Sequence, residues 1–177
     1  MRRWRLNQKT QNGLPRSWTT LASSVRARAE MAPGDLMNLA HLEKLRLCSA
    51  LESIADGLPN VDCARWLGTA NAIVPLLRDI HNFEETVIFP AYKACLTSAE
   101  VDLGTTGRLR LEHIKDQCFA GELAETLLAI GKGDPIESAE AIGFMLRGFF
   151  EGLRRHIAFE REHILPRIGV ADAGTPG

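Results

Sequence analysis

From position 35 onward, leucines, isoleucines and other apolar residues recur three and four positions apart, which is the period of an α-helix. This spacing divides the chain into four long segments, and nothing between them has the alternation of a β-strand. Long amphipathic helices joined by short turns bury their apolar faces against one another. The sequence therefore predicts an all-α fold, an antiparallel up-down-up-down four-helix bundle, with helices at about 35–56, 62–96, 108–130 and 134–168.

The expected helix ends coincide with residues that start or stop helices. Gly57-Leu58-Pro59 should end the first helix, Asp62 should cap the second, and Asp134-Pro135 should begin the fourth. Pro75 lies inside the second segment. Because proline has no backbone N–H and its ring clashes with the preceding turn, we expect a kink or a break there.

The chain of 177 residues is long enough for one sizeable core. We expect a single bundle at 35–168, preceded by a basic, flexible extension at 1–34 and followed by a flexible tail at 169–177. Seven of the 21 Lys and Arg residues fall in the first 30 positions beside one acid, so the remainder is acidic. An acidic body is a poor partner for nucleic acid and a better one for metal cations.

The location of the protein is predicted from its apolar runs and its cysteines. No apolar run approaches the roughly 20 residues that cross a bilayer, so no membrane partner is expected. The cysteines show neither a C-x-x-C pair nor the dense spacing of a disulfide scaffold. Reduced thiols fit a soluble, cytoplasmic protein, whose oligomeric state the sequence does not indicate. The four cysteines are Cys48, Cys63, Cys95 and Cys118.

Four of the five histidines fall one on each expected helix, and two of them are followed by glutamate four residues later. Residues four apart lie one above the other on a helix, so each His-x-x-x-Glu pair can hold one ion. Two such pairs and two lone histidines make six protein ligands for two metals. Mixed imidazole and carboxylate ligands favour iron, or manganese, over zinc. The six candidates are His41, His81, Glu85, His113, His156 and Glu160.

Two further residues lie close to these in sequence. His163 is seven residues beyond His156, and we expect it to shape the end of the site rather than to bind metal. Glu84 either orients a ligand histidine or lies on a solvated face. Apolar neighbours such as Ile80 and Phe83 indicate that the second helix turns this region inward.

A lone His, a His-x-x-x-Glu, another lone His and a final His-x-x-x-Glu, on four successive helices, resemble the hemerythrin-like, or HHE cation-binding, family over about residues 35–168. The second and fourth helices of that family often read like H-x-x-x-E-E and end at a proline, as HNFEE with Pro90 and HIAFE with Pro166 do here. The resemblance implies two iron atoms with oxo or hydroxo and carboxylate bridges. It implies the same six ligands, with Glu85 and Glu160 bridging.

Two positions place the chain within that family. Oxygen-carrying hemerythrins have a second histidine four residues after the third-helix histidine, where this chain has Gln117, and they tend to end in His-x-x-x-x-Asp, where it has Arg161. The chain is therefore more similar to bacterial di-iron proteins that repair iron-sulfur clusters under nitrosative stress. It is similar also to the iron-sensing hemerythrin domain of a ubiquitin-ligase subunit.

We therefore expect a binding or sensing protein for O2, NO, peroxide or iron, rather than an enzyme, with a role in stress response and a protein signalling partner. Three alternatives stay open. One is a ferritin-like di-iron oxidase, whose Glu-x-x-His signature occurs once, at Glu160 and His163. The second is an iron donor in iron-sulfur cluster repair, and the third is a metal-free helical adaptor.

Overall fold

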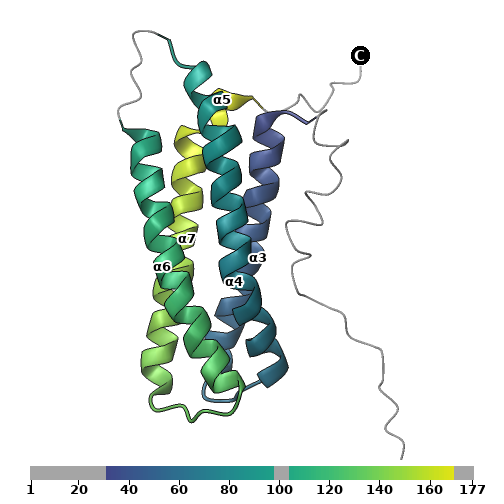
Figure 1. Ribbon diagram of the computed structural model, residues 1–177, viewed down its shortest axis with the longest axis vertical. Coiled ribbons are helices and arrows are strands. Elements are labelled where there is room, and N and C mark those ends of the chain that lie inside the picture. Colours follow the sequence, from purple (N-terminus) through teal and green to yellow (C-terminus); the bar gives the residue numbers. More distant parts are fainter. Residues whose placement is uncertain (1–30, 98–103, 170–177) are drawn as a thin grey trace, which may run out of the picture.

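The computed structural model describes residues 31–97 and 104–169. The described chain is helical, with short links at 58–62 and 132–138, which lie at the same end of the bundle in Figure 1. This confirms the all-α class, and two links at one end are what an up-down-up-down order requires. The elements are α3 Pro33–Gly57, α4 Cys63–Phe83, the π-helical turn η1 Glu84–Ile88, α5 Phe89–Ala94, α6 Thr105–Gly131, α7 Ala139–His163 and α8 Leu165–Ile168.

The predicted extension and tail lie outside the described residues, except for a few residues at their inner ends. Those residues meet, because the backbone N–H of Gly34 donates to the carbonyl of Gly169 over 3.0 Å. The first helix begins at Pro33, slightly before the expected start. Proline suits this first position because its missing N–H would have no helical partner there.

The helix caps confirm one expectation and correct another. The Asp62 side chain accepts a hydrogen bond from the Arg65 backbone N–H at the start of α4, as predicted. The fourth long helix, however, starts at Ala139 rather than at Asp134, because the Ser138 side chain accepts from the Ala141 backbone N–H. Ser138 is in extended conformation and satisfies a donor of the first turn that has no partner within the helix.

Of the kink or break predicted at Pro75, the break does not occur, because α4 runs without interruption from Cys63 to Phe83. Leu76 and Leu77 directly after the proline are buried, and tertiary packing of this kind outweighs the loss of one backbone hydrogen bond. The irregularity lies further on, in the π-helical turn η1. Single π-turns are rare and are often found at functional sites.

The core runs between the helices, with α4 packed mainly against α6 and α3 against α7 (Figure 1). Leu42, in the first helix, is exposed. Among the described residues, no helix combines the length and the apolar character needed to cross a bilayer. Each long helix supplies fully buried apolar residues, among them Leu47 and Leu51, Ile73 and Leu77, Leu123 and Leu127, and Leu146 and Leu153.

Candidate metal centre

The core also contains a set of polar and charged side chains. One histidine from each long helix is buried, and two glutamates and a lysine are buried among them. Charged groups in a protein interior are costly unless they are paired or bind a metal. The buried histidines are His41, His81, His113 and His156, and the buried charged residues that meet them are Glu84, Glu160 and Lys44.

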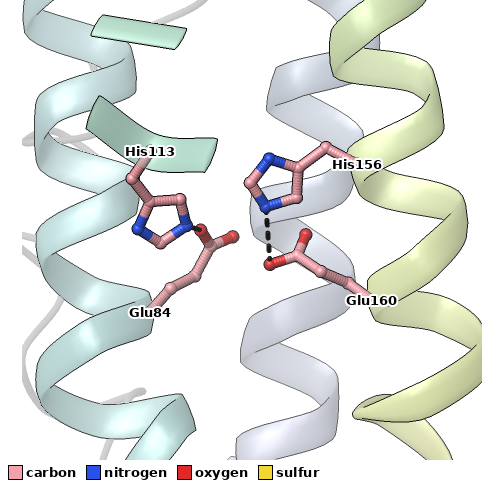
Figure 2. Close-up of side chains that lie close together, drawn as sticks. All are labelled: Glu84, His113, His156 and Glu160. Carbon is pink, nitrogen blue, oxygen red and sulfur yellow. Dashed lines mark ion pairs between the residues drawn. The ribbon is translucent and has the colours of Figure 1, made fainter. Parts of the chain in front are cut away.

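Four of these side chains come together in a group that could hold a metal ion. One ligand atom from each of Glu84, His113, His156 and Glu160 lies within 4.8 Å of the others, and all four residues are buried. Figure 2 shows the two carboxylates and the two imidazoles pointing toward one another, from η1, from α6 and from α7. Within residues 31–97 and 104–169 this is the single group of its kind.

Inside the group, each histidine faces a carboxylate. Nε2 of His113 lies 3.3 Å from Oε2 of Glu84, and Nε2 of His156 lies 3.5 Å from Oε1 of Glu160 (Figure 2). None of these four atoms has a hydrogen-bond partner among the described residues. Nearly all buried polar atoms in proteins are hydrogen-bonded, so four such atoms facing one another indicate a ligand. The donor set therefore fits a metal cation.

Glu85 does not join this group. Its side chain is 34% exposed, whereas that of Glu84 is fully buried. Oε1 of Glu85 lies 2.8 Å from Nδ1 of His113, on the side of the ring away from the group. Both glutamates belong to the π-helical turn, which has more residues per turn than an α-helix and changes the face on which each falls. The structure thus brings Glu84 inward, and ligation by Glu85 stays a prediction.

Three histidines have their Nδ1 atom held from outside the group. Beside the Glu85 contact to His113, Oδ2 of Asp116 lies 3.0 Å from Nδ1 of His156, and the Gln117 amide lies 3.2 Å from Nδ1 of His81. A carboxylate at Nδ1 fixes the ring so that the Nε2 lone pair is available to a metal. The amide of Gln117 can serve either tautomer of His81.

His81 stands beside the group. Its ring stacks on that of His113 with centroids 4.0 Å apart, and its Nε2 atom has no hydrogen-bond partner among the described residues. Burial, together with the nearby His113 and Lys44, lowers the pKa of His81 far below its usual value, so the ring is neutral. A neutral imidazole is the form that binds a metal.

His41 has the opposite arrangement to the other three histidines. Its Nε2 atom lies 3.1 Å from Oε2 of Glu160, and its Nδ1 atom has no hydrogen-bond partner among the described residues. The structure therefore places His41 against Oε2 of Glu160, whereas Oε1 is the oxygen that faces His156. Its ligation stays a prediction.

Lys44 connects the two buried glutamates. Its Nζ atom donates to Oε1 of Glu84 and to Oε2 of Glu160, over 2.7 Å in each case. Burial alone would lower the pKa of Lys44, but the two carboxylates outweigh it and raise that pKa above the ordinary value. Despite its own burial, Glu160 has a pKa well below the usual range, because the Lys44 ammonium is next to it.

His156 is held between two acids. Burial and the Lys44 charge act to lower its pKa, but the hydrogen bond to Asp116 and the nearby Glu160 carboxylate raise it to about 9. The ring is therefore a strong base, and a metal must displace its proton to bind at Nε2. Raised basicity of this kind strengthens a histidine ligand once the proton has gone.

His163 lies outside the group, and its expected part in shaping the end of the site stays a prediction. Its side chain is 45% exposed, and its ring lies 4.3 Å from that of Phe159. The Glu160-x-x-His163 pair therefore presents no second ligand to the buried group, because the histidine faces the surface.

Sequence reasoning missed Lys44 and Asp116, although spacing contains a signal for both. Lys44 is three residues after His41, and Asp116 is three residues after His113, so each lies on the same helix face as a buried histidine. A charged residue on the buried face of a helix is the pattern that reveals them.

Comparison with known proteins agrees with this geometry. A model of the family described as Hemerythrin HHE cation binding domain matches residues 32–168. No curated protein and no solved structure gives a significant match.

Proposed function

Because the chain belongs to the hemerythrin HHE cation-binding family, we propose that its buried centre binds iron and through it binds or senses a small ligand or the iron supply. Four unpartnered buried ligand atoms from Glu84, His113, His156 and Glu160 carry this proposal. Their mixed nitrogen and oxygen chemistry suits iron, with manganese as the alternative, better than zinc. Iron held by these four residues would supply the chemistry that binds O2, NO or peroxide.

The protein around the centre supports binding rather than turnover. The donor groups are fully buried, and Asp116 and Glu85 fix two of the histidine rings. A ferritin-like oxidase would need a further Glu-x-x-His pair, and His163 of the existing one is at the surface. Since a metal that binds only the folded chain stabilises it, loss of iron would loosen the bundle and could signal to a cytoplasmic protein partner under stress.

Metal analysis tests the proposal. The full chain is loaded anaerobically with Fe(II), passed over a desalting column and assayed for iron, with the expected result of at least one iron per chain. The double variant His113→Ala, His156→Ala should lose the iron while circular dichroism shows that it stays helical. His163→Ala is the matched control, because His163 is exposed and lies on α7 as His156 does, and this variant should keep the iron.

Optical spectra then identify the ligand. Spectra of the iron-loaded protein before and after addition of O2, NO or peroxide should change for the physiological class of ligand. Wild-type protein without iron after loading, or a control variant that loses as much iron as the double variant, would end the proposal.

A further inference from the structure

Lys44 donates a hydrogen bond to one of the two oxygens of each buried carboxylate, Glu84 and Glu160. Its side chain is fully buried, and Nζ lies 2.7 Å both from Oε1 of Glu84 and from Oε2 of Glu160. An ammonium group has three donors and no acceptor, so it cannot bind a metal while it is protonated. The other oxygen of each glutamate is the one that faces the metal group.

This division of oxygens resembles that of two carboxylates that bridge a pair of cations. In such a pair, each carboxylate gives one oxygen to each cation. Here Glu84 and Glu160 each give one oxygen to the ammonium of Lys44 and keep one unpartnered oxygen for the group with His113 and His156.

The ligands left on the side of Lys44 are too few for a second metal. Among the described residues no second group of ligand atoms could hold a metal. Of the predicted ligands, His41 contacts this side, since its Nε2 atom lies 3.1 Å from the same Glu160 oxygen that accepts from Lys44. A second cation would also lie close to a buried ammonium, where like charges repel strongly because water is excluded. The buried ammonium and the second metal therefore exclude each other.

We propose that the Lys44 ammonium occupies the place of a second metal, so that the centre binds one metal ion per chain through Glu84, Glu160, His113 and His156. This inference rests on the proposed function, since it supposes that the centre binds metal. It departs from the expectation of two bridged irons, and it assigns to Lys44 the charge that the second iron would supply. His81, whose ring stacks on that of His113 and whose Nε2 atom has no hydrogen-bond partner among the described residues, is a candidate further ligand for the single ion.

The test compares the number of metal ions bound per chain in the wild type and in Lys44→Ala. Full-length wild-type protein is titrated anaerobically with Mn(II), desalted and measured for metal content and by electron paramagnetic resonance. We expect one Mn(II) per chain and the six-line signal of an isolated ion. Lys44→Ala frees two carboxylate oxygens and opens space beside His41, so a second Mn(II) should bind, and exchange coupling between the two ions should broaden the signal.

Lys115→Ala removes an exposed lysine from α6 and should leave the count at one. Two exchange-coupled ions in the wild type would overturn the role of Lys44 but not metal binding, whereas no bound metal, from Mn(II) or from Fe(II), would overturn both. One ion in both the wild type and Lys44→Ala would show that the lysine does not set the count. If Lys44→Ala does not fold, Lys44→Met, which keeps most of the side-chain volume without the charge, takes its place, and a count of one in that variant overturns the role of the lysine.

Discussion

Oδ2 of Asp116 lies 3.0 Å from Nδ1 of His156, so a carboxylate on α6 orients a buried histidine on α7. The opposite ring nitrogen of His156 faces Glu160 and has no hydrogen-bond partner among the described residues. Glu85 holds His113 in the same way. Two carboxylates thus orient two imidazole rings so that their Nε2 atoms face the metal group.

Asp116→Ala should therefore weaken metal binding without removing a ligand. Loss of a carboxylate behind a ligand histidine costs roughly ten- to hundred-fold in metal affinity. Competition against a chelator of known affinity measures the change. Glu125→Ala, at an exposed acid on the same helix, is the matched control and should bind as the wild type does. An unchanged affinity in Asp116→Ala would show that the contact does not support the site.

Glu84→Gln and Glu85→Gln should have unequal effects, although the residues are neighbours of the same type. The first removes a buried charge and a ligand oxygen, and the second removes an acceptor outside the metal group. We expect Glu84→Gln to lose the metal on washing with a chelator, and Glu85→Gln to bind it roughly ten- to hundred-fold more weakly. A greater loss in Glu85→Gln would restore the ligand expected from the sequence.

Metal removal should lower the stability of the bundle. A ligand that binds only the folded state at 100 to 1,000 times its Kd adds about 3 to 4 kcal/mol to the free energy of unfolding. Urea denaturation with and without Fe(II), under anaerobic conditions, measures the difference. His113→Ala should abolish it, because the variant lacks one ligand of the group. Equal midpoints for loaded and metal-free wild type would contradict this prediction.

The apolar core can be tested apart from the metal. Leu77→Ala should reduce the free energy of unfolding of the metal-free protein by about 2 to 5 kcal/mol, because Leu77 is fully buried and its truncation leaves a cavity. Leu111, whose exposed fraction is 61%, provides the control. Leu111→Ala should change the free energy by no more than about 0.5 kcal/mol in urea denaturation. Similar losses in both variants would mean that the assigned core is wrong.

The thiol of Cys48 should resist alkylation in the folded protein. Burial raises its pKa to about 11, and the thiol donates to the Phe150 carbonyl at 3.6 Å. Because the folded pKa lies above the ordinary value of 9.0, the stability that this group contributes is complete below pH 9 and is lost as the pH rises through about 11. Mass spectrometry after iodoacetamide at pH 8 should show Cys48 unmodified.

The exposed thiols Cys63, Cys95 and Cys118 supply the internal control, because they should react under the same conditions. In denaturant all four cysteines should react. Modification of Cys48 in the native protein at the rate of the other three would contradict its burial.

Much of the fold follows from local sequence, because a helix depends on contacts between residues three and four apart. The apolar period predicted four long helices, and Asp62 was correctly expected to cap α4. Pro75 shows the limit of such reasoning, since the local rule allows a kink or a break there and the helix, with Leu76 and Leu77 buried, is unbroken. The helix α7 also starts later in the chain than predicted, because Ser138 provides the cap.

The residues of the candidate metal centre were likewise predicted in part from the sequence and decided in part by the tertiary structure. The sequence alone determined that each long helix bears one inward histidine, because spacing on a helix decides which residues share a face. Tertiary structure decided between Glu84 and Glu85, since a π-helical turn changes the face on which each residue falls. It also decided that Lys44 lies between Glu84 and Glu160, a contact among three helical segments far apart in the chain. Local periodicity cannot specify such distances, because they depend on how the helices pack.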